Sequence, residues 1–352
     1  MIRVGLVGFG LAGRVFHAPL ISSVEGLELA AVVERSSDKA AALYPGVTTY
    51  RTVEELLADS TIKLVVIATP NKTHHDLALS ALEAAKSVVV DKPASVNSAE
   101  IIDLMELAGG IGLQLVPFHN RRWDNDFLTI QNLLHEKALG RLVHFTSTLD
   151  RWRPGATRSP WKDDQDQGGI LLDLGTHLVD QALVLFGKPA SIGAEILRER
   201  DGEGANDSFT IRFHYYSGPS ITLSANTLSS IPRARFHLRG TKGNYVKFGV
   251  DPQEEALGKI TRIDSLDWGK EAPDHSGTLS VDADNTAVAR PLESVPGNYR
   301  LFYEGVRDAI LGKGPEPVSA IDAWRTARVL EYALESSKAS RDVECDWTSE
   351  PQ

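Results

Sequence analysis

The first 120 residues alternate between short aliphatic runs and segments whose apolar residues recur with a helical period. The aliphatic runs lie at 2–8, 27–34, 63–69, 86–91 and 113–118. They are apolar almost throughout, so each strand needs cover on both sides, which a parallel sheet with helices on both faces provides. This alternation predicts an α/β fold class for residues 1–120, with a parallel sheet covered by helices on both faces. Its helices are expected at 53–59, 73–85 and 98–110, the last beginning near Asn97 and Ser98.

The rest of the chain, 121–352, has a different pattern. Segments in which polar and apolar residues alternate lie at 141–152, 207–216, 220–228 and 233–249. Such alternation indicates strands with one face on a core and the other exposed. Helices are expected at 121–140, 168–187, 299–311 and 320–338. We therefore predict a C-terminal α+β domain with an open, largely antiparallel sheet, and we expect the polar region 250–297 to be a string of loops.

Composition and charge limit the possible partners. The chain has 47 Asp and Glu against 37 Lys and Arg, a formal net charge of −10, so it offers little to a nucleic-acid backbone. Its single cysteine, Cys345, excludes an internal disulfide and a cysteine-based metal site. No apolar run approaches the roughly 20 residues that span a bilayer, and no signal-peptide pattern is present. We expect a cytoplasmic protein that binds neither nucleic acid nor membrane.

The stretch VGFGLAG places Gly8, Gly10 and Gly13 between the first strand and a helix. In this G-x-G-x-x-G spacing, the first glycine permits a tight turn, the second lets a pyrophosphate approach the backbone, and the third allows close helix–strand packing. Free N–H groups at the helix start can then hold the phosphates. Glu34, at the end of the second strand, has the spacing of an acid that binds ribose hydroxyls. The residues expected to bind the dinucleotide at this turn are Gly8, Phe9, Gly10, Leu11, Ala12 and Gly13.

The residues after the second strand give conflicting indications about the coenzyme. Glu34 favours NAD because a carboxylate accepts hydrogen bonds from ribose hydroxyls. Arg35, Ser36 and Ser37 follow directly, and they favour NADP because they could bind a 2′-phosphate. The sequence predicts NADP or NAD and leaves the preference open.

Two further segments carry ionisable side chains. In VVVDKPAS, Asp91 and Lys92 follow the fifth strand, at the sheet edge where ligands bind, and Pro93 restricts Lys92 to an extended backbone. In GGILLDLGTHLVDQALVLFG, Asp173 and His177 share one face of a largely apolar helix. Other interpretations are a solvated lysine, a core histidine bonded to a carbonyl, and an aspartate paired with an arginine.

The segments GFGLAG, ATPNKTHHDLALSALEAAKSVVVDKP and GGILLDLGTHLVDQAL together resemble the glucose–fructose oxidoreductase/inositol dehydrogenase (Gfo/Idh/MocA) family. The resemblance covers nearly the entire chain. It implies a Rossmann domain, then an α/β domain with an open mixed or antiparallel sheet, and NAD- or NADP-dependent oxidation of sugars or cyclitols. FHAPLI, FHNRRWDNDFLT, GTKGNYVKFGVDPQEE and VPGNYRLFYEGVRDAI look like the bacterial NADP-dependent scyllo-inositol 2-dehydrogenases and their uncharacterised relatives.

By motif position, the resemblance implies that Lys92, Asp173 and His177 converge beside the nicotinamide. Histidine can take the hydroxyl proton near neutral pH, and the Lys92 ammonium can hold negative charge on the substrate oxygen. Asp173 could bind a neighbouring hydroxyl or orient the imidazole. Further residues expected at the coenzyme are Thr69, Pro70, Asn71, His74, Asp91 and Lys92. Those expected to line the substrate cavity are His119, Asn120, Arg121, Arg151, Trp161, Asp173 and His177.

The leading prediction is an NAD(P)-dependent dehydrogenase acting on a CH–OH group of a polyhydroxylated ring, with scyllo-inositol as the best single substrate. Another sugar or sugar-acid dehydrogenase of the same family is the second possibility, and a non-catalytic dinucleotide sensor is the third. We expect no metal, because the adjacent His74 and His75 do not give convergent ligands. An open sheet with one uncovered face predicts a homodimer or homotetramer formed through the C-terminal sheet.

Overall fold

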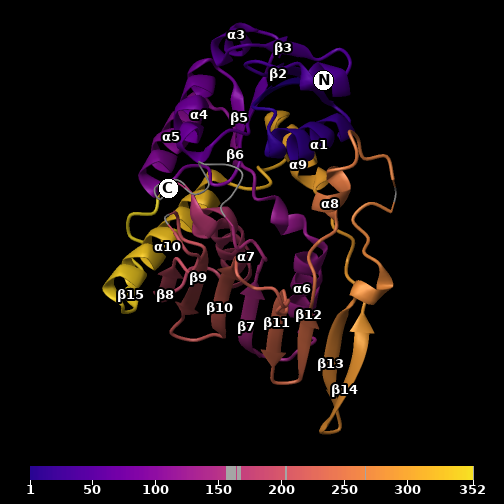
Figure 1. The fold of residues 1–352 in the computed structure, drawn as a ribbon, viewed down its shortest axis with the longest axis vertical. Helices are drawn as coiled ribbons and strands as arrows, with labels where there is room; N and C mark the ends of the chain where they lie inside the picture. The colour runs from indigo at the N-terminus through magenta and orange to yellow at the C-terminus, as the bar shows by residue number, and fades with distance from the viewer. Residues whose placement is uncertain (156–163, 165–167, 203, 266, 352) are drawn as a thin grey trace. The chain divides into compact units, whose positions relative to one another are not determined.

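The computed structural model describes residues 1–155, 164, 168–202, 204–265 and 267–351. The chain divides into two compact units (Figure 1). The first unit contains Met1–Trp123, Pro252–Trp268 and Asn298–Trp324, and the second contains Asp124–Asp251, Gly269–Gly297 and Arg325–Gln352. Within the described ranges, no helix combines the length and apolar character needed to cross a membrane.

The first unit contains a six-stranded parallel sheet in the order β3-β2-β1-β4-β5-β6. Its strands are β1 (Ile2–Val7), β2 (Leu27–Val33), β3 (Thr48–Tyr50), β4 (Leu64–Ile67), β5 (Ser87–Val90) and β6 (Leu115–Pro117). Every residue of β4 and β5 is buried, as expected for strands covered on both faces. The strand order reverses between β1 and β4, which is the Rossmann arrangement and confirms the predicted α/β domain.

The helices of the first unit connect these strands or follow the last of them in the chain. They are η1 (Gly13–His17) with α1 (Ala18–Ser23), α2 (Lys39–Leu43), α3 (Val53–Ala58), η2 (Asn71–Thr73) with α4 (His74–Glu83), α5 (Ser98–Ile111), η3 (Asn120–Trp123), α8 (Gln253–Leu257) and α9 (Arg300–Ile310). The predicted start of α5 is confirmed, because the Asn97 side chain accepts the N–H of Glu100 at 3.0 Å. Figure 1 shows α4 and α5 side by side. These two helices follow β4 and β5, whose carboxyl ends carry predicted site residues.

The second unit contains a nine-stranded sheet in the order β14-β13-β12-β11-β7-β10-β9-β8-β15. Its strands are β7 (Leu142–Thr148), β8 (Ser191–Leu197), β9 (Ser208–His214), β10 (Ser220–Asn226), β11 (Phe236–Gly240), β12 (Gly243–Lys247), β13 (Gly277–Ala283), β14 (Thr286–Leu292) and β15 (Val343–Glu344). The largely antiparallel prediction is confirmed. The exception is the pair β7 and β10, which run parallel.

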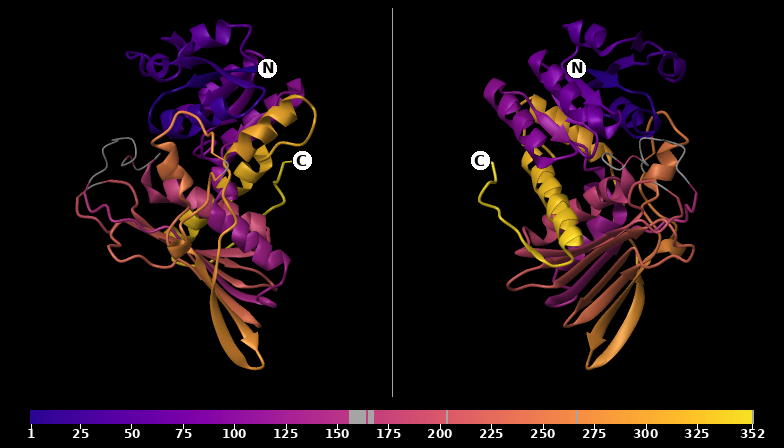
Figure 2. Two further views of the ribbon diagram at one scale, coloured as in Figure 1. Left: turned by 90° about the vertical axis from the view of Figure 1, so that its right-hand side faces the viewer. Right: turned by 60° about the vertical axis from the view of Figure 1, so that its left-hand side comes forward.

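Helices cover one face of this sheet. They are α6 (Asn125–His135), η5 (Leu171–Gly175) with α7 (Thr176–Phe186), and α10 (Ala320–Ala339), which begins in the first unit (Figure 2). Phe209, Ile211 and Phe213 of β9 are buried in the core beneath these helices. Arg212 and His214 alternate with them and are exposed on the opposite face. The predicted alternation therefore separates the core face from an open face.

The prediction of loops over 250–297 was wrong. This region contains α8, a 3-10 turn η6 (Pro273–His275) and the hairpin β13–β14, which pairs over seven residues and extends beyond the neighbouring strands (Figure 1). β14 lies at the edge of the sheet and is almost entirely exposed, so it has no apolar face to mark it in the sequence. The signal that could have found it is the turn, where Asp284 and Asn285 both have positive φ, as two-residue hairpin turns require.

Candidate functional site

The glycine turn after β1 has the geometry that a pyrophosphate site needs. Gly8 has φ of +97°, and a Cβ there would lie 2.5 Å from the Ala68 carbonyl oxygen. A Cβ on Gly13 would lie 2.1 Å from the Gly8 carbonyl oxygen, whereas a Cβ on Gly10 would meet nothing within 4 Å. Gly8 thus makes the turn, Gly13 allows the close packing, and Gly10 leaves open space above the backbone.

The loop after β2 holds Glu34 in an unexpected way. Its carboxylate is buried and accepts the Ser37 hydroxyl at 2.6 Å and the Ala40 N–H, in the first turn of α2, at 2.8 Å. Arg51, which the sequence interpretation missed, donates to the carbonyls of Glu34 and Ser37 at 3.0 and 2.7 Å. Arg35 and Ser36 are exposed. Arg51 follows β3, a three-residue strand at the edge of the sheet. No sequence pattern predicted this strand or the contacts of Arg51.

The carboxyl ends of β4 and β5 carry Thr69, His74 and the D-K-P segment. His74 is buried, with its Nδ1 2.7 Å from the Pro93 carbonyl oxygen and its Nε2 2.8 Å from that of Thr69. Asp91 and Lys92 are partly exposed, and the Lys92 backbone N–H donates to Asp91 Oδ1 at 2.8 Å. Pro70 is exposed and Asn71 is buried. The His74 ring therefore links the two strand ends directly, through its contacts with their backbone carbonyls.

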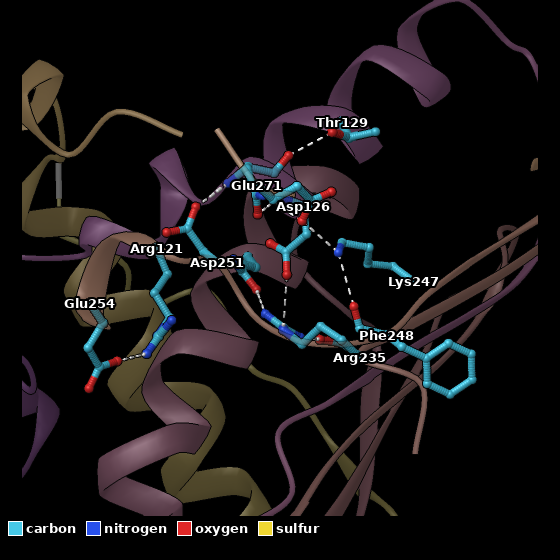
Figure 3. Close-up of polar contacts among 12 residues, drawn as sticks. Arg121, Asp126, Thr129, Arg235, Lys247, Phe248, Asp251, Glu254 and Glu271 are labelled. Carbon is cyan, nitrogen blue, oxygen red and sulfur yellow. Dashed lines mark hydrogen bonds and ion pairs between the residues drawn. The ribbon is translucent and has the colours of Figure 1, made fainter. Parts of the chain in front are cut away.

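The end of β6 supplies three further predicted residues. His119, Asn120 and Arg121 are all buried. One guanidinium nitrogen of Arg121 donates to Glu254 Oε2 at 2.9 Å, within the same unit (Figure 3). The expected contact between Arg121 and substrate stays a prediction, and Glu254 is an ion-pair partner that the sequence interpretation did not name.

The second unit holds the acid and the imidazole of the predicted centre. His177 is 6% exposed in α7, and the Asp173 side chain is 31% exposed in the preceding π-helical turn. Arg151 Nη1 lies 3.5 Å from Asp173 Oδ2, so Asp173 does pair with an arginine, and two residues assigned to the substrate cavity lie together. Trp161 lies outside the described residues. Lys92 belongs to the first unit, and its convergence with Asp173 and His177 stays a prediction.

A network of buried charged and polar side chains joins α7 to α6 and to the sheet. Arg235, just before β11, donates to Gln181 Oε1 on α7 at 2.9 Å, and its Nε lies 3.5 Å from Asp126 Oδ2 on α6 (Figure 3). It also donates to Ser147 on β7. Sequence reasoning missed this arginine, because a charge in the middle of a polar–apolar alternation looks like a surface residue. Its contacts fix the helix that carries His177 against the sheet.

No group of three or more His, Cys, Asp or Glu side chains in the described ranges is arranged to hold a metal ion.

Comparison with protein families assigns both parts of the chain. The model described as the oxidoreductase family NAD-binding Rossmann fold (GFO_IDH_MocA) matches residues 2–119, and the model of the same family's C-terminal α/β domain matches residues 131–345. The chain belongs to the Gfo/Idh/MocA family. The resemblance drawn from its motifs is thereby confirmed, and with it a Rossmann domain of the NAD-binding type. A dehydrogenase activity agrees with this assignment.

Gfo/Idh/MocA relatives match over the full length. YdgJ of Escherichia coli K12, an uncharacterized oxidoreductase, is 42% identical over 96% of each chain. The scyllo-inositol 2-dehydrogenase (NADP(+)) IolW of Bacillus subtilis 168 is 30% identical over 97% of this chain and 95% of its own. The solved structure of YPO2259 from Yersinia pestis superposes with a TM-score of 0.93 at 41% identity, covering 99% of this chain and 98% of that one. The similarity to these proteins places the chain in an oxidoreductase family.

Proposed function

We propose that this protein is an NADP-dependent dehydrogenase that interconverts a secondary alcohol of a cyclitol or sugar and the corresponding ketone, with scyllo-inositol as substrate. The observation that carries the proposal is the complete set Lys92, Asp173 and His177 in a chain that matches, from end to end, a relative named as an NADP(+) scyllo-inositol 2-dehydrogenase. A relative that served only as a dinucleotide sensor would not need to keep these three side chains.

The residues would divide the reaction as follows. The chemistry supplied by a bound nicotinamide ring is acceptance of the hydride from the carbinol carbon. His177 takes the hydroxyl proton, and Lys92 binds the same oxygen as negative charge develops on it. The Arg151–Asp173 pair offers a donor and an acceptor 3.5 Å apart, which suits two adjacent hydroxyls of a polyol ring. The same groups serve ketone reduction in the reverse direction.

The loop after β2 supports NADP rather than NAD. The Glu34 carboxylate is buried and already accepts two hydrogen bonds, from the Ser37 hydroxyl and from the Ala40 N–H of α2, which reduces its capacity to bind ribose hydroxyls. Arg35 and Ser36 are exposed directly beside it and could contact a 2′-phosphate. Arg51 holds the loop backbone in this conformation through two carbonyls. We therefore assign the 2′-phosphate to the Arg35–Ser36 segment.

A substrate panel tests the proposed function. The protein is mixed with NADP⁺ or NAD⁺ and with the inositol stereoisomers, common aldoses and sugar acids, and coenzyme reduction is followed by absorbance. We expect turnover of scyllo-inositol with NADP⁺ and a kcat/KM that is lower for NAD⁺. Turnover of an aldose or sugar acid alone would replace the substrate assignment. Coenzyme binding by fluorescence without turnover of any compound, in either direction, would favour a sensor.

We also propose that two copies associate through the open face of the nine-stranded sheet. A row of cross-strand neighbours crosses this face at Arg212, Thr222, Thr146 and His237. A Thr222→Arg variant would place like charges side by side in the middle of such an interface. We expect a dimer or tetramer for the wild type by sedimentation velocity and a smaller assembly for the variant. A monomeric wild type at micromolar concentration would contradict this proposal.

A further inference from the structure

The environment of His74 constrains its protonation. The ring lies at the start of α4 and is 1% exposed. Both of its nitrogens face backbone carbonyl oxygens, of Pro93 at 2.7 Å and of Thr69 at 2.8 Å. A carbonyl oxygen can only accept, and a neutral imidazole has one N–H to donate. The doubly protonated ring is the one form that donates to both carbonyls.

A second buried histidine shows the contrast. His17 Nδ1 lies 2.7 Å from the Tyr303 hydroxyl, and its Nε2 faces Asp91 Oδ2 at 3.9 Å. A hydroxyl can donate as well as accept, so a single ring proton, on Nε2, is enough to match both neighbours of His17. His17 and His74 therefore meet different requirements, and of these two it is His74 that lies between two pure acceptors.

Asp91 supplies the charge that a protonated His74 needs. Burial raises the pKa of the Asp91 carboxyl, but the contact with His17 and nearby positive charge, that of Lys92 included, outweigh it, and the pKa is lowered from its ordinary value. The carboxylate is therefore ionised at neutral pH. A buried cation is tolerated when hydrogen-bond acceptors and an opposite charge lie near it. His74 has the two carbonyl acceptors, and its electrostatic interaction with Asp91 supplies the opposite charge.

The two carbonyls belong to the functional edge of the sheet. Thr69 follows β4, and Pro93 comes directly after Lys92 at the end of β5. We propose that His74, as a doubly protonated imidazolium, is a positioning residue that ties these two strand ends together and so fixes the backbone that presents Lys92. This role rests on the proposed function, because it acts through the contact of Lys92 with the substrate.

The charge state can be measured without turnover. The full-length protein is labelled with [¹⁵N]histidine, and the His74 ring nitrogens are assigned by comparison with a His74→Phe variant. We expect both nitrogens to carry a proton at neutral pH. One protonated and one bare nitrogen would overturn the proposal, whatever the activity of the protein.

The positioning role is tested by variants at His74, with the neighbouring His75 as a matched control. His74→Phe keeps a ring but removes both donors, and His74→Gln keeps one donor group. His75 pairs with Asp76 at 2.9 Å on the same helix. A displacement of a reacting group by about 1 Å can cost roughly 100-fold in rate. We therefore expect kcat to fall about 100-fold for His74→Phe and less for His74→Gln, and to stay within about twofold for His75→Ala.

Coenzyme affinity separates positioning from general loss of structure. The glycine turn is untouched in these variants, so NADPH should still bind His74→Phe at full stoichiometry. Wild-type kcat in His74→Phe would overturn the positioning role. If the wild type turned over no compound of the panel, the proposed function would fail, and the labelled spectrum would still decide the charge state of His74.

Discussion

Two lysine–glutamate pairs of nearly equal length allow the cost of a buried charge to be measured within one chain. Lys247 Nζ lies 2.8 Å from Glu271 Oε2, with side chains 0% and 3% exposed. Lys259 Nζ lies 2.7 Å from Glu255 Oε1, with side chains 70% and 80% exposed. Lys247 also donates to the carbonyl of Phe248 at 3.0 Å (Figure 3) and to that of His275 at 2.6 Å, so all three of its ammonium protons have acceptors.

We predict that Lys247→Met strongly destabilises the second unit. Methionine fills similar space, but the Glu271 carboxylate is left buried without its cation, and removal of one partner of a buried pair costs about 3–5 kcal/mol. Two carbonyls also lose a charged donor, so we expect a loss of about 4 kcal/mol. With a urea dependence of about 2 kcal/mol per molar, the unfolding midpoint should fall by about 2 M. Lys259→Met should leave the unfolding midpoint unchanged, because water solvates the exposed Glu255 carboxylate once the lysine is gone.

The assay is a urea titration followed by tryptophan fluorescence and far-UV circular dichroism. Because the chain has two units, each transition is fitted separately. The double variant Lys247→Met with Glu271→Gln should recover part of the loss, since no buried charge is then left unpaired. The midpoint to compare is that of the second unit. If it were the same in Lys247→Met and Lys259→Met to within about 0.3 M, the Lys247–Glu271 pair would not have the stabilising role assigned to it.

Three further predictions concern the site and the response to pH. Lys92→Ala and His177→Ala should fold and bind coenzyme but lose about 10²–10⁴ in kcat; wild-type turnover in either variant would remove that residue from the mechanism. Arg35→Ala should lower the NADPH/NADH ratio of kcat/KM by about tenfold or more, as expected for loss of a charged contact to phosphate, and an unchanged ratio would exclude Arg35 from coenzyme choice. Burial raises the pKa of Asp207, but two backbone N–H groups and the Arg200 guanidinium outweigh it and lower that pKa. Its carboxylate therefore stabilises the fold above about pH 4, near the ordinary aspartate pKa, and this contribution is lost as the pH falls through the lower folded value. The difference in Tm between wild type and Asp207→Asn should thus be large at about pH 7 and should decrease as the pH is lowered below about 4; a difference that does not change with pH would contradict the assignment.

The Rossmann part of the fold could be predicted because its determinants are local. Strands such as β4 and β5 are apolar on both sides, and the three glycines of the turn each have the conformation or the spacing that their pattern implies. The hairpin β13–β14 could not be predicted in this way. β14 lies at the sheet edge with neither face buried, so no periodicity marks it.

The candidate site was predictable in its motifs but not in its supporting contacts. Arg151 and Asp173 were both assigned to the substrate cavity, and they pair. Arg235, by contrast, reaches Asp126 and Gln181 over large separations in the chain, and its burial is decided by the tertiary packing of α6 and α7. Buried charges that meet only in the folded chain leave no local pattern, which is why such contacts escaped prediction.

We propose that an ammonium from the first unit, that of Lys92, and an imidazole from the second, that of His177, act on one hydroxyl. The most direct measurement is a crystal structure of the wild-type protein with NADPH and scyllo-inositol bound. We expect Lys92 Nζ and a His177 ring nitrogen both to lie within hydrogen-bond distance of the same substrate oxygen, with the carbinol hydrogen directed at the nicotinamide. A nicotinamide ring that lies far from either side chain would contradict it.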